Sequence, residues 1–143
     1  MWDLSSCALS TARLRGATYA DARVMDVRHR DVSTKNGEVG TVAESVSYGI
    51  GIRVIANGAW GFAATDRLTR AGIQACAAQA VAIAKASALT KRADVVMAPE
   101  QPFVDSWQSP FLKDPFEIPI ESQLDLLLSA DAEMRRVKGV TLA

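Results

Sequence analysis

The chain has 143 residues, of which 49% are apolar and 22% charged, values that are ordinary for a globular domain with a core of its own. Sixteen basic and sixteen acidic side chains give a formal net charge of zero, so the basic excess of a nucleic-acid-binding protein is absent. A single histidine and two distant cysteines exclude a two-histidine metal site and the Cys-x-x-Cys spacing. We therefore assign no catalytic or metal-ligating residue and expect no nucleic-acid partner.

The expected cellular location rests on two patterns that the sequence lacks. No apolar run approaches the roughly 20 residues of a membrane span, and residues 1–10 lack the charged and then apolar pattern of a signal peptide. We therefore expect a cytoplasmic protein without a membrane partner. In a reducing compartment Cys7 and Cys76 are expected as free thiols, although the sequence leaves a disulfide between them open.

The first segment predicts a short helix followed by a strand. Apolar residues recur at helical spacing over residues 4–14, and Gly16 stands where such a helix would end. Strand formers then dominate residues 19–33. Their alternation slips near Val24, which indicates either a strand covered on both faces or a bulge.

Two Asn-Gly pairs predict tight hairpins, because both central residues of a type I′ turn need positive φ. Asn36-Gly37 joins the first strand to a second that runs from Glu38 to about Ser47. Asn57-Gly58 joins two further strand-like segments. Four strands joined by tight turns predict an antiparallel four-stranded meander.

The register at the second hairpin separates two faces of the sheet. Ala56 pairs with Ala59, and the register continues outward. One face collects aliphatic residues suited to a covering helix, namely Ile50, Ile52, Val54, Gly61 and Ala63. The other face places Arg53, Trp60 and Phe62 beside glycines.

Arg53, Trp60 and Phe62 are the candidate contacts for a peptide or a partner chain, because interfaces concentrate arginine and aromatic residues at their centres. The alternative is simple cation–π packing within the sheet, worth roughly 0.5–2 kcal/mol. We favour this structural alternative over the functional one.

The rest of the chain predicts two helices separated by an irregular stretch. Thr69 is the expected N-cap of an alanine-rich helix from Arg70 to about Ser87. Residues 88–119 hold all five prolines and several aromatic residues, which predicts an extended arm packed on this chain or on a partner. A last helix is expected over residues 120–137, followed by the first residues of a strand.

These elements predict an α+β protein with helices on one face of the sheet. The expected domains are an α+β amino-terminal domain over residues 1–87, an arm or linker over 88–119, and a helix with the start of a strand over 120–143. We expect this last part to lead into a missing carboxy-terminal domain.

Three apparent motifs carry no chemistry. Gly49-Ile50-Gly51 lacks the third glycine and the following helix of a dinucleotide loop, so strand glycines that allow close backbone approach are favoured. His29 has no partner in the sequence that would make it a catalytic base, so an exposed or ordinarily packed histidine is favoured. Glu117 and Glu121 are explained by the dipole at the start of the last helix.

Several of these segments, taken in order, resemble the amino-terminal domain of the TldD/PmbA family, whose members are labelled as candidate modulators of DNA gyrase. The matching segments are Tyr19-Ala20-Asp21-Ala22-Arg23-Val24, Asn36-Gly37, Gly49-Ile50-Gly51-Ile52-Arg53-Val54 and Gly58-Ala59-Trp60-Gly61-Phe62-Ala63. The stretch from Trp107 to Ile120 is similar to the linker of many members.

The resemblance implies a zinc metallopeptidase system that cleaves peptides or unfolded segments as a homodimer or as a heterodimer with a related subunit. The family's metal motif, His-Glu-x-x-x-His with a later cysteine, belongs to the carboxy-terminal part, and nothing here matches it. The resemblance therefore implies that zinc is bound outside this chain. The chain itself would shape the substrate channel and the dimer interface. The alternative is a stand-alone protein-binding module without enzymatic activity.

Overall fold

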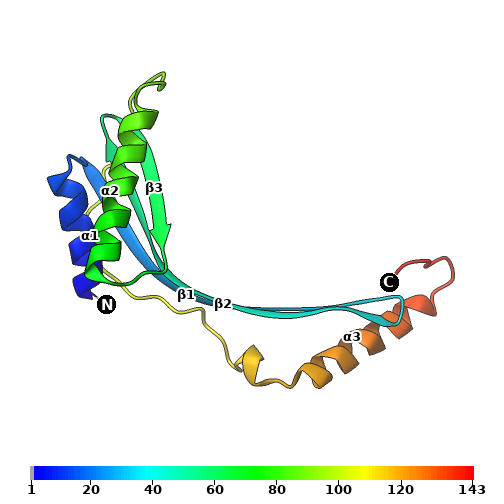
Figure 1. Cartoon of the computed structure of the whole chain (residues 1–143). Helices are drawn as coiled ribbons and strands as arrows, with labels where there is room; N and C mark the ends of the chain where they lie inside the picture. Colours follow the sequence, from blue (N-terminus) through cyan, green and yellow to red (C-terminus); the bar gives the residue numbers. More distant parts are fainter. Residues whose placement is uncertain (1) are drawn as a thin grey trace. The chain divides into compact units, whose positions relative to one another are not determined.

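The computed structural model describes residues 2–143, which form three α-helices, three β-strands and one 3-10 turn (Figure 1). In chain order these are α1 (Trp2–Leu14), β1 (Tyr19–Lys35), β2 (Glu38–Ala56), β3 (Ala59–Thr65), α2 (Arg70–Ser87), η1 (Pro115–Glu117) and α3 (Ile120–Arg135). The strands form one sheet in the order β1-β2-β3. The predicted α+β class is therefore confirmed.

The chain divides into two compact units. Unit 1 comprises the chain through Val27 together with Ser47–Pro102. Unit 2 comprises Arg28–Val46 together with Phe103–Ala143. Strands β1 and β2 continue from one unit into the other, and each unit is described separately below. The residue bounds expected for the domains stay a prediction.

The predicted four-stranded meander is wrong, since the described residues contain three strands. The second and third predicted strands are one continuous strand, β2, of 19 residues. Gly49 and Gly51 do not break it, because neither has a positive φ. A Cβ on Gly49 would lie 2.9 Å from the carbonyl oxygen of Thr65, so this glycine permits close approach of β3 instead of a turn.

Both predicted hairpin turns are confirmed. Asn36 and Gly37 have φ values of 53° and 83°, and Asn57 and Gly58 have values of 52° and 71°. These positive values are those that a type I′ turn needs. The predicted pairing of β2 with β3 is also confirmed, from Ala56↔Ala59 through Ile52↔Ala63.

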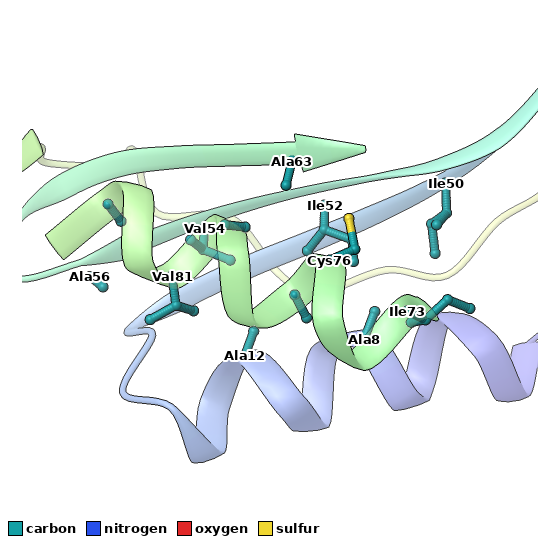
Figure 2. Close-up of a cluster of buried hydrophobic side chains, with 13 residues drawn as sticks. Ala8, Ala12, Ile50, Ile52, Val54, Ala56, Ala63, Ile73, Cys76 and Val81 are labelled. Atoms are coloured by element: carbon teal, nitrogen blue, oxygen red, sulfur yellow. The ribbon is translucent and has the colours of Figure 1, made fainter. Parts of the chain in front are cut away.

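The core of unit 1 lies between one face of the sheet and the helices α1 and α2 (Figure 2). Its buried members are almost all small or β-branched: Ala8, Ala12, Ile50, Ile52, Val54, Ala56, Ala63, Ile73, Cys76, Ala77, Ala80, Val81 and Ala84. Strand β1 adds Ala20, Ala22 and Val24, which pack against this cluster. The regular alternation of these three residues places Tyr19, Asp21, Arg23 and Met25 on the opposite face.

The opposite face of β1 is uncovered, since Met25 and Val27 are exposed. The expectation of a strand covered on both faces is therefore wrong for this part of the chain. The apolar stripe of α2, expected from helical spacing to consist of Ile73, Cys76, Ala77, Ala80, Ile83 and Ala84, differs at one position, because Val81 is buried and Ile83 is exposed. The predicted N-cap is confirmed, since the Thr69 hydroxyl accepts a hydrogen bond from the Gly72 amide at 3.1 Å.

Helix α2 lies against β3 with almost no side chain between them. A Cβ on Gly61 would lie 2.1 Å from the Ala80 carbonyl oxygen and 2.6 Å from the Ala84 amide nitrogen. Only glycine fits there, and only alanine-sized residues fit on the facing turn of the helix. This contact fixes the distance between the two layers.

Cys7 and Cys76 are free thiols, as expected. Cys76 lies in the core beneath the sheet, and its burial raises the pKa of the thiol because the thiolate would lose its hydration there. The thiol therefore stays neutral and acts as a small apolar side chain.

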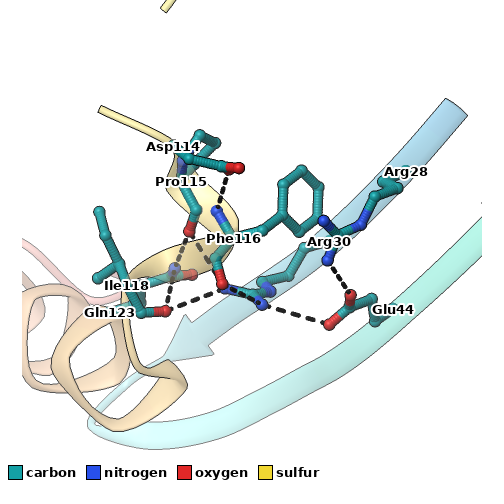
Figure 3. A network of polar contacts seen from close by, with 8 residues as sticks. All are labelled: Arg28, Arg30, Glu44, Asp114, Pro115, Phe116, Ile118 and Gln123. Carbon is teal, nitrogen blue, oxygen red and sulfur yellow. Dashed lines mark hydrogen bonds and ion pairs between the residues drawn. The ribbon is translucent and has the colours of Figure 1, made fainter. Parts of the chain in front are cut away.

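In unit 2, Arg30 of β1 binds the backbone of the turn before α3 (Figure 3). The two terminal nitrogens of Arg30 donate to the carbonyl oxygens of Pro115, Phe116 and Ile118 at 3.1–3.3 Å, and one of them also binds Glu44 at 3.3 Å. The guanidinium carbon of Arg28 lies 4.2 Å from the centre of the Phe116 ring, and that of Arg30 lies 5.0 Å from it. The Arg30 side chain is only 12% exposed.

The far end of α3 is attached to the hairpin turn in unit 2. Arg135 donates to the carbonyl oxygen of Asn36 at 2.9 Å. Asn36 also exchanges two hydrogen bonds with Ala143, at 3.0 Å and 3.1 Å. Between these attachment points the one fully buried residue of α3 is Asp131, whose carboxylate lies 3.7 Å from Arg135 and accepts no hydrogen bond within the described residues.

The proline-rich stretch contains no strand and only the short turn η1. The predicted packing of an arm is not confirmed, because Phe103, Trp107 and Phe111 are exposed, and Trp107 is 79% exposed. Phe116 is the aromatic residue of this stretch that the structure packs, against the two arginines of unit 2. The helix predicted after it is confirmed as α3, but residues 140–143 form no strand.

Gly61→Ala tests the close contact between α2 and β3. The added methyl group has no space, so the helix must move away from the sheet, and we expect the free energy of unfolding to fall by about 3 kcal/mol. Urea denaturation followed by circular dichroism measures this change. Gly40→Ala on β2 is the matched control, because its Cβ would meet first the Ser33 hydroxyl, at 3.0 Å. Equal effects of the two substitutions would contradict the assigned role of Gly61.

Arg30→Lys tests the hydrogen bonds between Arg30 and the turn before α3. Lysine keeps the charge but cannot reach three carbonyl oxygens from a planar group. We expect a local loss of about 2 kcal/mol, or roughly thirtyfold faster amide hydrogen exchange in the first turn of α3. Arg28→Lys is the control and keeps a cation over Phe116, so exchange should change little. If exchange in that turn were unchanged in Arg30→Lys, these hydrogen bonds would not stabilise it.

Candidate functional site

The candidate site is the face of the unit 1 sheet that no helix of that unit covers. Strand β1 contributes side chains from Tyr19 to Met25, β2 contributes Gly51 and Arg53, and β3 contributes Trp60 and Phe62. They share one face because successive side chains of a strand alternate, and the helices occupy the other face. The site is therefore built on regular strands, without a loop residue.

Arg53 and Asp21 form the polar centre of this face. The Nε and Nη2 atoms of Arg53 each lie 2.8 Å from the same carboxylate oxygen of Asp21. The Tyr19 hydroxyl donates to that oxygen as well, at 3.0 Å. The hydrogen bond that Arg53 donates to Asp21 is the main cause that raises the pKa of Arg53, while desolvation and then the neighbouring Asp21 carboxylate raise the pKa of Tyr19. Both donors therefore stay protonated and remain bound to Asp21.

Trp60 is held on this face by two neighbours. The guanidinium carbon of Arg53 lies 5.0 Å from the centre of the Trp60 ring, within the range of a cation–π interaction. The Tyr19 ring meets the same indole edge to face, with centroids 5.8 Å apart and an interplanar angle of 89°. Trp60 is therefore a fixed, partly buried platform.

Phe62 lies beside Gly51 and is 58% exposed. A Cβ on Gly51 would lie 3.1 Å from the Phe62 ring, so the missing side chain gives the ring its place. The ring, the glycine and Met25 border a hollow of about 200 Å³ that is open to solvent. Its other lining residues are Asp21, Arg23 and Arg53.

The structure thus brings the three predicted residues onto one face. Arg53 and Trp60 are in direct contact, as the structural alternative predicted, and Phe62 is paired with Arg53 across the two strands. The prediction did not include Tyr19 and Asp21, which fix Arg53. The alternation of alanines in β1 is the signal that would have placed them on this face.

A second hollow, of about 270 Å³, lies in unit 2 beside Arg28, His29, Arg30 and Phe116. His29 is exposed, in agreement with its interpretation as an ordinary histidine. Both arginines are engaged there by Glu44 and by the Phe116 ring. Each arginine that lines this hollow is therefore already paired within unit 2, so neither is free to bind a ligand.

Within residues 2–143, no group of three or more histidine, cysteine, aspartate or glutamate side chains is placed to hold a metal ion. In the same range, no helix combines the length and the apolar character that crossing a membrane requires.

The sequence is similar to known metalloproteases over most of its length. Residues 20–84 match the sequence model of the PmbA/TldA metallopeptidase domain 1. The chain is 32% identical over 112 residues to a metalloprotease of Methanothermobacter thermautotrophicus, and 18% identical over 127 residues to one of Methanocaldococcus jannaschii. These alignments cover 78% and 87% of this chain but only 23% and 28% of those proteins.

A solved structure shows the same fold. It is a candidate modulator of DNA gyrase from Bacteroides thetaiotaomicron, with a TM-score of 0.60 and 15% sequence identity. The match covers 96% of this chain and 30% of that one. The family match over β1–β3 and α2 and the two metalloprotease relatives point to the same family. Residues 20–84 therefore correspond to the first domain of the PmbA/TldD metallopeptidase family.

Proposed function

We propose that this chain is the non-catalytic amino-terminal part of a metallopeptidase and that its uncovered sheet face contacts the peptides or unfolded segments to be cleaved. The observation that carries the proposal is the preformed cluster of Arg53, Trp60 and Phe62 on that face. Rigid aromatic groups on strands bind at a low entropic cost, because they lose little freedom when a ligand arrives. In the whole enzyme this face would form one wall of the substrate channel.

The metal of the proposed enzyme is not assigned to this chain. The described residues contain no suitable group of ligands, and the two cysteines are far apart in the sequence. We place the metal, expected to be zinc, in a carboxy-terminal part, because the relatives named metalloproteases are several times longer than this chain. The role of the chain is then to hold and orient a peptide.

We further propose that unit 2 takes part in a dimer, with a second copy or a related subunit. Val39, Val42 and Val46 are exposed along β2, which has no third strand beside it in this unit. Helix α3 is attached to this two-stranded ribbon, yet the three valines stay exposed. Apolar exposure on such a ribbon favours a protein partner.

A protein-binding module that acts without a peptidase is the second candidate function. It is favoured by the name of the solved structure from Bacteroides thetaiotaomicron, which refers to DNA gyrase. Such a module would bind one folded partner and would not prefer unfolded chains. A preference for the unfolded over the folded form of one test protein therefore separates the two functions.

Trp60→Ala tests the peptide-contact face. We expect the chain to bind reduced, carboxymethylated α-lactalbumin in preference to the native, folded form. Removal of the indole should raise the Kd for the unfolded form about tenfold, the effect of losing a central aromatic anchor. Fluorescence anisotropy of the labelled lactalbumin measures the binding.

Trp107→Ala is the matched control, because it removes an exposed indole from the irregular stretch of unit 2. Its Kd should equal that of the unchanged chain. Equal binding by both variants, or no preference for the unfolded form, would refute the proposed peptide contact.

Val42→Lys combined with Val46→Lys tests the proposed dimer. Two added charges on the exposed apolar ribbon should oppose association, because a buried unpaired charge is costly. We expect the unchanged chain to show the mass of a dimer in light scattering at about 100 µM and the double variant that of a monomer. Ser45→Lys, one position away on β2, is the single-charge control. A unit 2 interface is wrong if the double variant stays dimeric.

A further inference from the structure

The hollow beside Phe62 has the construction of a pocket for one side chain. Its volume of about 200 Å³ is several times the roughly 30 Å³ that a water molecule occupies in the liquid. Gly51 leaves its floor without a side chain, while Met25 and the Phe62 ring form apolar walls. Both walls are exposed, so an occupant would remove apolar surface from water.

The rim of the hollow carries unequal charges. Asp21 is the single acidic residue of its lining, against the two arginines Arg23 and Arg53. One oxygen of Asp21 already accepts from Arg53 and from the Tyr19 hydroxyl. The hollow therefore has a surplus of one positive charge.

That surplus belongs to Arg23. Its Nε lies 3.7 Å from the other oxygen of Asp21, beyond hydrogen-bond distance, and its side chain is 71% exposed. Arg53 is fixed by two bonds of 2.8 Å and by Trp60, so it is not free to turn toward a ligand. Arg23 is free to do so, and a guanidinium binds a carboxylate with two parallel hydrogen bonds.

We propose that this hollow is a specificity pocket for a bulky apolar side chain of a peptide, with Arg23 binding a carboxylate next to that side chain. This inference rests on the proposed peptide contact and adds the class of sequence that is preferred. The face would select an apolar residue followed by an acidic residue. Trp60 supplies the neighbouring platform and is not part of the pocket.

The test uses the unchanged chain and three capped pentapeptides that differ at one position each. The reference is acetyl-Gly-Gly-Leu-Glu-Gly-amide, and the others replace Leu by Ala or Glu by Gln. NMR titration follows the amide signals of Gly51 and Phe62, the methyl signal of Met25 and the indole N–H signal of Trp60. We expect the reference to shift these signals, with about tenfold weaker binding for the Ala peptide and about fivefold weaker binding for the Gln peptide.

Two variants of the chain identify the pocket. Arg23→Gln should remove the preference for Glu over Gln and leave the preference for Leu over Ala. Gly51→Ala should weaken binding of the Leu peptide, because the new methyl group would lie 3.1 Å from the Phe62 ring and would displace this wall of the hollow. Arg13→Gln is the control, since Arg13 lies on α1, the helix that packs on the other face, and both preferences should remain.

The outcomes separate this inference from the function on which it rests. If peptides shift the Trp60 signals equally well whatever their sequence, the specificity pocket is wrong and the peptide contact stands. If no peptide shifts any signal of this face, both are wrong. If Arg23→Gln and Arg13→Gln behave alike, Arg23 does not bind the carboxylate.

Discussion

The contact between Gly61 and helix α2 determines how unit 1 is built. It brings the helix backbone onto β3, because a Cβ on Gly61 would lie 2.1 Å from the Ala80 carbonyl oxygen. Where β3 meets the helix, a layer this thin leaves room only for small side chains, and the core is rich in alanine, with Ile50, Ile52 and Ile73 as its larger members. The aromatic side chains of the strands then lie on the other face. The helix contact thus explains why Tyr19, Trp60 and Phe62 are gathered where no helix covers them.

On that face one carboxylate determines what each arginine can do. Asp21 holds Arg53 with two hydrogen bonds, and the fixed guanidinium in turn supports the Trp60 ring. The energy of such a partly exposed pair is small, commonly below about 1 kcal/mol, so its main effect is to set positions. A residue that resembles a binding cation in the sequence therefore acts as a positioning residue. The charge available to a ligand lies two residues from Asp21, on Arg23.

The features that could be predicted from sequence are those that depend on neighbouring residues. The two Asn-Gly turns need positive φ locally, and each turn sets the register of the strands that it joins. The N-cap at Thr69 is equally local. The break expected in β2 after about Ser47 was wrong, but the close backbone approach expected at the strand glycines is confirmed at Gly49, which lies against Thr65 of β3.

The candidate site could be predicted in part for the same reason. Arg53, Trp60 and Phe62 share one hairpin, so their common face follows from one register. Tyr19 and Asp21 come from β1, whose position beside β2 depends on the hairpin at Asn36-Gly37, which begins 15 residues after Asp21. The contacts of Arg30 carry no sequence signal, since three of its acceptors are backbone carbonyl oxygens that any residue could supply.

The zero net charge of the chain hides an arrangement that occurs twice. In unit 1 Arg23 and Arg53 share Asp21, and in unit 2 Arg28 and Arg30 share Glu44. Each time one arginine is committed to the fold while its companion is the more exposed of the two, 71% against 42% in unit 1 and 49% against 12% in unit 2. In unit 2 the Phe116 ring occupies the companion, Arg28, so that pair is satisfied within the chain. In unit 1 the companion, Arg23, has no such aromatic partner among the described residues, and the aromatic group beside it, Phe62, borders an open hollow. The more exposed arginine is therefore bound by the chain itself in unit 2, whereas in unit 1 it is available to a ligand.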